Sequence, residues 1–222
     1  MKKRNVYLII ALIVLADQLI KIYIKTHYYL GEFHSVLGNW FQLYFIENKG
    51  MAYGLEFGGG IGKIALTLFR LAAVIFGVFY ISKIIEKKYA RGFIICVALI
   101  FAGALGNLID SMFYGLIFEN SNPDMHNVAR MFTGHGYAGF MHGNVVDMFY
   151  FPLIDTHWPQ WVPFLGGKNF SFFDYIFNVA DASVSIGVIT IILFKKRFFK
   201  AQEDTESPSE PEITDPGIES GQ

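Results

Sequence analysis

The stretch Phe177–Phe194, FNVADASVSIGVITIILF, is long and apolar enough to cross a bilayer, which predicts a membrane helix. Two polar residues, Asn178 and Asp181, lie near its start. A carboxylate inside a membrane segment costs about 2.5–3.5 kcal/mol on insertion scales, and such residues usually mark a reaction centre or an ion path. Because Asn178 and Asp181 are three residues apart, they share one helix face, which we expect to point at protein or water. The sequence therefore predicts a function for Asp181, against the alternative of a hydrogen bond that only ties helices together.

The composition is that of an integral membrane protein. Of the 222 residues, 53% are hydrophobic and 17% are charged, and the mean hydropathy is +0.38. A soluble domain carries about 25% charged residues. The formal net charge of −1 argues against nucleic acid as a partner. The single cysteine, Cys96, lies in an apolar run, so we expect a small buried hydrophobe and no disulfide framework.

Four apolar runs predict a membrane all-α core, a four-transmembrane-helix bundle. They cover residues 6–24, 61–85, 93–110 and 177–194, and the last run stops at Lys195–Arg197. Basic residues follow the N-terminus and cluster near Lys87 and Lys195, and such segments favour the cytoplasmic side. Both termini are then cytoplasmic, and segments 25–60 and 111–173 lie outside. Residues 40–46 alternate loosely and predict a strand. Residues 1–200 form the predicted membrane domain, and residues 201–222 an acidic, disordered cytoplasmic tail.

Polar residues from helices that are distant in sequence reach one depth. Asp181 lies 14 residues before Lys195, or ~21 Å along a helix. Asp17 lies 13 residues after Arg4, or ~20 Å, and Asp110 lies 19 residues after Arg91, or ~28 Å. All three fall in the outer third of a hydrocarbon core that is ~30 Å thick. Asp147, in an outer segment, could reach the same zone.

Two aspartates that meet near an apolar boundary can perform general acid–base chemistry. Carboxyl groups about 3 Å apart cannot both ionise, so they share a proton. One then activates a water as base while the other polarises the scissile carbonyl. We predict Asp147 and Asp181 for this pair, with water as nucleophile and no cofactor. Asp124, Asp155 and Asp174 are alternative candidates for the second carboxylate, in place of Asp147.

The other polar candidates have structural alternatives. We expect Asn178 to hold a carboxylate or the backbone, and Asp17 and Lys21, four residues apart, to form an intramembrane ion pair. Asn107 and Asp110 are equally compatible with orienting catalytic groups and with a polar helix end. Arg70 either snorkels or is paired, in a structural role.

Asn48 and Gly50 could line a substrate cleft, although the spacing alone favours an ordinary turn. His135 and His142, with Asp147, match no zinc signature, so no metal is expected.

Five short motifs, in order along the chain, together resemble the lipoprotein signal peptidases, or signal peptidase II. Each motif is weak alone, but their order over the predicted helices is specific. They are Asp17-Gln-Leu-Ile-Lys21, Asn48-Lys-Gly-Met-Ala-Tyr-Gly54, Gly106-Asn-Leu-Ile-Asp110, Val145-Val-Asp-Met-Phe149 and Phe177-Asn-Val-Ala-Asp181.

The resemblance implies a monomeric aspartic endopeptidase of the bacterial inner membrane. It implies cleavage of prolipoproteins just before a cysteine that carries diacylglycerol, in a site open to membrane lipid and to globomycin-type inhibitors. It also implies a small extracytoplasmic β-cradle and a long outer loop. The implied catalytic residues are Asp147 and Asp181. The implied supporting residues are Asp17, Lys21, Asn48, Gly50, Asn107, Asp110, Asn178 and Ala180.

The chain departs from the family pattern in several places, of which Tyr53 for the more usual Phe is mild and the acidic tail is extra. The third motif usually ends in arginine, where this chain has Ser111, and the segments on both sides of Asp147 are longer than usual. A proton relay or transporter is the main alternative function, but it predicts polar residues through the full membrane depth. Thr190 is the only polar residue in 188–194, the cytoplasmic half of the last predicted helix, which counts against a relay. A non-catalytic scaffold leaves Asp181 unexplained, and a lipid-headgroup transferase needs a cytoplasmic acidic cluster.

Overall fold

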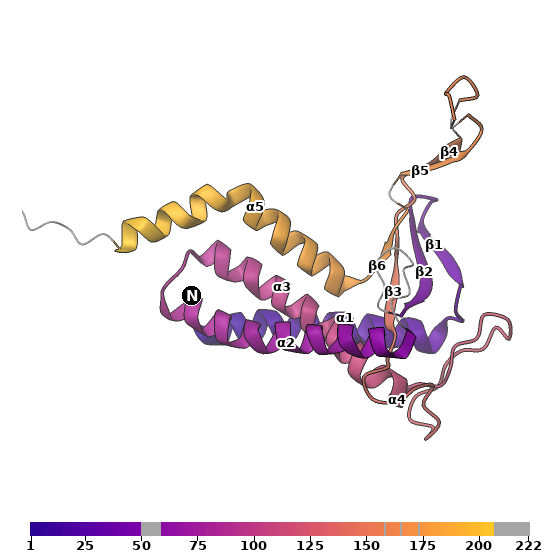
Figure 1. Ribbon diagram of the computed structural model, residues 1–222, viewed down its shortest axis with the longest axis horizontal. Coiled ribbons are helices and arrows are strands. Elements are labelled where there is room, and N and C mark those ends of the chain that lie inside the picture. Colours follow the sequence, from indigo (N-terminus) through magenta and orange to yellow (C-terminus); the bar gives the residue numbers. More distant parts are fainter. Residues whose placement is uncertain (50–58, 158, 165, 173, 207–222) are drawn as a thin grey trace, which may run out of the picture.

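The computed structural model describes residues 1–49, 59–157, 159–164, 166–172 and 174–206. These residues form four long helices, with the strands gathered at the end of the helices opposite to the N-terminus (Figure 1). The helical elements are α1 (Lys3–His27), α2 (Gly59–Glu86), α3 (Arg91–Ile109), the π-helical turn η1 (Asp110–Tyr114), α4 (Gly115–Ile117) and α5 (Val179–Glu206).

Three helical segments are long and apolar enough to cross a membrane: 3–27, 60–86 and 91–117. The third was predicted to end at Asp110. It continues through η1 and α4 to Ile117, because residues 112–117 are largely apolar and keep packing in the bundle. In α5 the uncharged stretch between Asp181 and Lys195 is only 13 residues long (182–194).

The bounds of α5 also differ from the prediction. Residues Ile176–Phe177 form strand β6, so the helix begins at Val179. It does not stop at Lys195–Arg197 but runs to Glu206, because Lys, Arg, Ala, Gln and Glu all have high helix propensity. The rest of the predicted tail, residues 207–222, lies outside the described residues.

An antiparallel sheet of four strands in the order β1-β2-β3-β6 covers one end of the helices. Its strands are β1 (Phe33–Leu37), β2 (Phe41–Asn48), β3 (Val145–Tyr150) and β6 (Ile176–Phe177). The strand predicted around residues 40–46 is confirmed as β2. Asp147 lies opposite Ile46 in the β2–β3 pair, and β6 leads directly into α5. A separate hairpin pairs β4 (Ile154–His157) with β5 (Asn169–Phe172).

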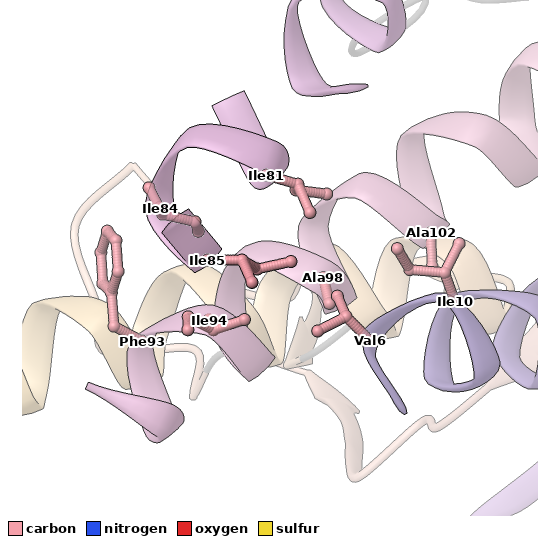
Figure 2. Packing of buried hydrophobic residues seen from close by; sticks show 9 residues of the cluster. All are labelled: Val6, Ile10, Ile81, Ile84, Ile85, Phe93, Ile94, Ala98 and Ala102. Carbon is pink, nitrogen blue, oxygen red and sulfur yellow. The ribbon is translucent and has the colours of Figure 1, made fainter. Parts of the chain in front are cut away.

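Two apolar clusters flank a polar layer. Figure 2 shows the first cluster, in which α1, α2 and α3 bury Val6, Ile10, Ile81, Ile84, Ile85, Phe93, Ile94, Ala98 and Ala102. The second, beside the sheet, buries Ile24, Phe45, Tyr114, Phe118, Val146 and Met148. Along α1 the polar residues Asp17 and Lys21 fall between Ile10 and Ile24, and therefore between the two clusters.

Glycines of α3 allow α5 and α1 to approach closely. A Cβ atom at Gly103 would lie 2.2 Å from the carbonyl oxygen of Ala180, and one at Gly106 would lie 2.6 Å from Asp17 Oδ2. Small residues at helix interfaces are typical of packing in membranes. Here they bring the start of α5 and the carboxylate of Asp17 against the same face of α3.

Candidate active site

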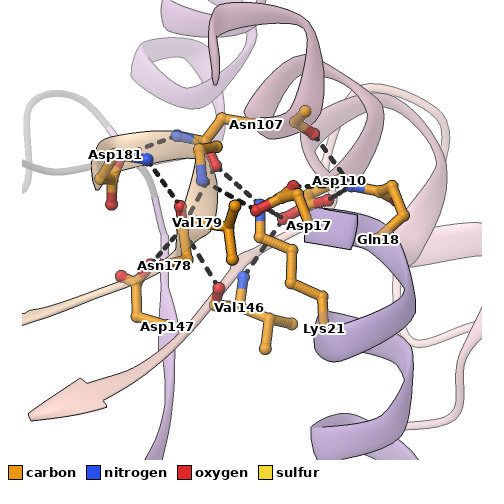
Figure 3. A network of polar contacts seen from close by, with 12 residues as sticks. Asp17, Gln18, Lys21, Asn107, Asp110, Val146, Asp147, Asn178, Val179 and Asp181 are labelled. Atoms are coloured by element: carbon orange, nitrogen blue, oxygen red, sulfur yellow. Dashed lines mark hydrogen bonds and ion pairs between the residues drawn. The ribbon is translucent and has the colours of Figure 1, made fainter. Parts of the chain in front are cut away.

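The polar layer joins residues from α1, α3, β3 and α5 in one network (Figure 3). It lies where the start of α5 meets the C-terminal end of α3. It contains eight of the ten predicted site residues: Asp17, Lys21, Asn107, Asp110, Asp147, Asn178, Ala180 and Asp181. The convergence predicted from helix depth is therefore confirmed for the helices and for Asp147.

The inner part of this network is an ion cluster around Lys21. The ammonium lies 2.9 Å from Asp17 Oδ2 and 2.7 Å from Asp110 Oδ2. It also donates to Asn107 Oδ1 at 2.8 Å. The side chains of the three charged residues are at most 1% exposed. The predicted Asp17–Lys21 ion pair is confirmed, and Asp110 is its second carboxylate.

The remaining acceptors of the inner cluster are also occupied. Gln18 Nε2 donates to Asp110 Oδ1 at 2.8 Å, and Gln18 Oε1 accepts from the Tyr114 hydroxyl at 3.1 Å. The backbone N–H of Ala180 donates to Asp17 Oδ1 at 2.9 Å. Two buried carboxylates thus share one cation and several neutral donors, which is the condition under which buried charges are tolerated.

The outer part contains Asp147 and Asp181, which are bridged by two asparagines. Asn178 Nδ2 donates to Asp147 Oδ1 at 2.6 Å, and Asn107 Nδ2 donates to Asp181 Oδ1 at 2.8 Å. The asparagines also meet each other, since Asn178 Nδ2 lies 3.2 Å from Asn107 Oδ1. The backbone N–H of Asp181 donates to Asn178 Oδ1 at 2.9 Å, which ties the first turn of α5 to the same group. Asn178 therefore holds both a carboxylate and the backbone, as predicted.

The two outer carboxyl groups differ in environment. Asp147 is 1% exposed in β3, whereas Asp181 is half-buried at the start of α5. Burial, followed by the nearby negative charge of Asp181, raises the pKa of Asp147 to about 8. At neutral pH, Asp147 is mostly protonated. A neutral acid beside a more accessible carboxylate is the asymmetry that acid–base catalysis by two carboxyl groups requires.

The other predicted residues lie at the edge of the site or outside it. Asn48 ends β2 and pairs with Val145, two residues before Asp147. Gly50 lies outside the described residues. Of the competing aspartates, Asp174 accepts a hydrogen bond from the Tyr150 hydroxyl, Asp155 lies in the separate β4–β5 hairpin, and Asp124 is in the loop after η1 and α4.

Sequence reasoning missed the contacts of Gln18 and of Arg70. Gln18 follows Asp17 directly, and its neighbours in the sequence do not show that it turns toward Asp110. Arg70 was predicted to be snorkelling or paired. Its Nη1 donates to the Ser111 hydroxyl at 2.7 Å, so it points into the bundle. The available signal was a lone intramembrane cation, which marks a functional position by default.

A family model described as signal peptidase (SPase) II matches residues 9–196 of the chain. The lipoprotein signal peptidase of Porphyromonas gingivalis is 46% identical over 187 residues, which cover 83% of this chain and 80% of that protein. The lipoprotein signal peptidase of Amoebophilus asiaticus is 32% identical over 212 residues, covering 94% and 84%.

Two solved structures of bacterial membrane enzymes are also similar to this chain. The first has a TM-score of 0.53 at 24% identity and covers 94% of both chains, so it shows similarity of fold alone. The second has a TM-score of 0.51 at 25% identity and covers 86% of this chain and 92% of the other.

Proposed function

Because this chain belongs to the signal peptidase II family, the aspartic peptidases that remove signal peptides from prolipoproteins, we propose that Asp147 and Asp181 are its catalytic pair. The observation that carries this proposal is the bridge between them. Asn178 contacts Asp147 while Asn107 contacts Asp181, and the two asparagines meet. Among the described residues, this brings together two carboxyl groups that have no cation within ion-pair distance.

The roles of the two groups follow from their environments. Asp147 carries the proton at neutral pH, because burial raises its pKa to about 8. It donates a hydrogen bond to the scissile carbonyl oxygen. Asp181 accepts a proton from the attacking water, whose oxygen bonds to the carbonyl carbon to give a tetrahedral intermediate. Return of that proton to the leaving amine breaks the C–N bond and restores the pair.

The supporting residues act through these two. Asn107 and Asn178 fix the carboxylate orientations, so that each aspartate presents its other oxygen to substrate or water. The Asp17–Lys21–Asp110 cluster, together with the Asp17 contact to the Ala180 N–H, fixes the start of α5 against α1 and α3. Asn48 and Gly50 belong to our proposal as residues of the substrate cleft.

The proposed substrate is a prolipoprotein with a diacylglyceryl cysteine, cut just before that cysteine. A lipid-anchored substrate presents its scissile bond at the membrane surface. The sheet lies at the end of the helices opposite to the N-terminus (Figure 1), and Asp147 of its strand β3 belongs to the polar layer, which supports a site near the outer face. Globomycin-type inhibitors would occupy the same cleft, and a monomer is sufficient.

The proposed membrane arrangement uses α5 as a fourth crossing. Its 13 uncharged residues are extended by the half-buried first turn on one side and by Lys195–Arg197, which can snorkel, on the other. Both termini are then in the cytoplasm of a bacterium, the protein lies in the inner membrane, and the sheet forms an extracytoplasmic cradle. Residues 1–200 are the proposed peptidase domain, and residues 201–222 are a cytoplasmic extension.

The arrangement favours a peptidase over a proton relay. A relay needs titratable groups along the whole membrane thickness. In this bundle the polar layer is followed toward the N-terminal end of α1 by the apolar cluster of Figure 2, which α1, α2 and α3 build.

Cleavage of a diacylated prolipoprotein peptide by the purified protein tests the proposal. We expect Asp147→Asn and Asp181→Asn each to lower kcat/KM by about 10²–10⁴, with the fold retained. The matched control is Asp174→Asn, which removes an exposed aspartate of the outer segment that contacts Tyr150. The control should cleave like wild type. Full activity in either catalytic variant contradicts the assignment, and proton flux into liposomes without cleavage supports the relay.

A further inference from the structure

Arg70 occupies one polar face of α2 together with Lys63 and Thr67. Lys63 donates to Asn144 Oδ1, the Thr67 hydroxyl lies 3.3 Å from the Met141 carbonyl, and Arg70 donates to Ser111. The spacing of these residues, four and three, puts them on the same side of the helix. Large apolar side chains of α2 are exposed instead: Ile61, Leu68, Phe69, Ile75, Phe76, Val78 and Phe79.

The guanidinium is too deep to reach the membrane surface along its own helix. Arg70 lies 11 residues after Gly59 and 16 before Glu86, or ~16 and ~24 Å from the two ends of α2. A cation held at this depth costs about 2.5–3.5 kcal/mol on insertion scales. No carboxylate of the described residues lies within ion-pair distance of Arg70. Among the described residues, the hydrogen-bond partner of this half-buried side chain is the Ser111 hydroxyl, which does not neutralise its charge.

A continuous chain of hydrogen bonds links Arg70 to the proposed catalytic pair. The Ser111 hydroxyl accepts from Arg70 at 2.7 Å and donates to the Asn107 carbonyl at 2.8 Å. The side chain of the same Asn107 donates to Asp181 at 2.8 Å. Ser111 thus anchors the guanidinium beside the residue that orients Asp181.

Charge complements this geometry. The carboxylates whose charges act on Arg70 are, in order of strength, those of Asp181, Asp110 and Asp147. Asp110 is already within ion-pair distance of Lys21. Asp147 is mostly protonated at neutral pH because its pKa is raised. Asp181 is therefore the carboxylate left for Arg70 to balance.

We propose that Arg70 is a positioning residue that acts on Asp181 across Ser111 and Asn107. This inference rests on the proposed function, because it takes Asp181 as the base. The role differs from that of Lys21, which is within ion-pair distance of its aspartates. Arg70 reaches Asp181 through Ser111 and Asn107 instead, and Asn107 contacts Oδ1 of Asp181, which leaves Oδ2 for water.

Among the described residues, the ionisable groups of the network that contains Asp181 come from α1, α2, β3 and the junction of α3 with η1. They are Arg70 of α2, Asp147 of β3, Asp110 at the end of α3, and Asp17 and Lys21 of α1. The apparent pKa values of kcat/KM therefore belong to the coupled group. The acidic limb of the profile, where kcat/KM rises with pH, reports deprotonation of the base in the free enzyme.

The test is the pH profile of kcat/KM for peptide cleavage by purified wild type, Arg70→Gln and Arg70→Lys. Loss of the positive charge makes ionisation of the pair harder, so we expect Arg70→Gln to move the acidic limb upward by about one pH unit. Arg70→Lys keeps the positive charge, so its acidic limb should lie at the same pH as that of wild type, even if kcat/KM is lower. A merely structural role would lower kcat/KM without moving the limb.

The matched control is Lys63→Gln, which removes a cation from the same face of α2, seven residues or ~10 Å closer to its outer end. Its acidic limb should stay within 0.2 pH units, or about the measurement error, of wild type. An unmoved limb in Arg70→Gln, or an equal shift in Lys63→Gln, overturns the inference. Neither result affects the proposed function, which fails only if Asp147→Asn or Asp181→Asn keeps full activity.

Discussion

The molecule contains two groups of buried carboxylates within one network, and they are built in opposite ways. In the inner cluster, Asp17 and Asp110 share Lys21 at 2.9 and 2.7 Å. In the outer pair, Asp147 and Asp181 accept hydrogen bonds from Asn178 and Asn107 at 2.6 and 2.8 Å, and neither has a cation within ion-pair distance among the described residues. The same residue type is thus compensated by charge in one place and by amides in the other.

This difference separates a structural role from a reactive one. A carboxylate within ion-pair distance of an ammonium already has both a charge partner and a fixed orientation. A carboxylic acid that is held by neutral amides changes its protonation state near the working pH. The inner cluster therefore stabilises the joint between α1, α3 and α5, and the outer pair is left free to react. The predictions below test that division, beginning with the largest expected effect.

Removing the ammonium group of Lys21 should strongly lower the stability of the folded protein. Lys21→Met leaves Asp17 and Asp110 buried without their shared partner, and breaking a buried ion pair by removing one member costs about 3–5 kcal/mol. We expect a large fall in the thermal unfolding temperature in detergent. The control is Lys3→Met, because Lys3 pairs with Glu86 at 2.8 Å between exposed side chains and should lose little. Equal stability of Lys21→Met and wild type would show that the inner cluster is not structural.

Replacing the carboxylic acid of Asp147 by a neutral amide should have the opposite effect on stability. The pKa of Asp147 rises from 3.8 to about 8 on folding, because of burial and then the charge of Asp181. Between these values the folded state binds a proton that the unfolded state has lost, so stability falls as pH rises through that window. Asp147→Asn keeps the acceptor for Asn178 and carries no charge. At about 1.4 kcal/mol per pKa unit over the interval from 3.8 to pH 7, it should be more stable than wild type by up to about 4 kcal/mol.

The pH dependence distinguishes this effect from a general gain in packing. The unfolding temperatures of wild type and Asp147→Asn should converge as pH falls toward about 4. Asp174→Asn, at an exposed position, should follow wild type throughout. If Asp147→Asn is less stable than wild type at pH 7, Asp147 has a structural role like that of Asp17 and Asp110.

Much of this division could be predicted from the sequence. The apolar runs predicted the cores of all four long helices, and counting residues from the basic ends predicted that Asp17, Asp110 and Asp181 share one depth. Spacing of four predicted the Asp17–Lys21 pair. These predictions succeed because helix rise and the position of charges relative to the bilayer are properties of single segments.

What could not be predicted depends on contacts between segments. Asn107 and Asp110 were equally compatible with a catalytic role and a polar helix end, because nothing on α3 alone shows that Asn107 turns to Asp181 and Asp110 to Lys21. The end of α3 was placed at Asp110, although the helix continues through a π-helical turn to Ile117. The direction of Arg70 depends on Ser111, which is 41 residues away along the chain.

The smallest effect on stability should come from Gln18, an uncharged side chain that contacts the inner cluster. Gln18 Nε2 donates to Asp110 Oδ1 at 2.8 Å, so Gln18→Leu removes this donor, together with the acceptor of the Tyr114 hydroxyl, but leaves Lys21 in place. Loss of a hydrogen bond to a charged group costs about 1.5–3 kcal/mol. The retained ion pair and partial access to water should keep the cost near the lower end. This cost is measured by comparing thermal unfolding of Gln18→Leu with that of Gln42→Leu. Gln42 lies in β2, and its side-chain amide donates to the Asn39 carbonyl at 3.2 Å at an exposed position. If Gln18→Leu loses as much stability as Lys21→Met, the cluster depends on its amide as strongly as on its cation, and the distinction between charge-compensated and amide-compensated carboxylates does not hold.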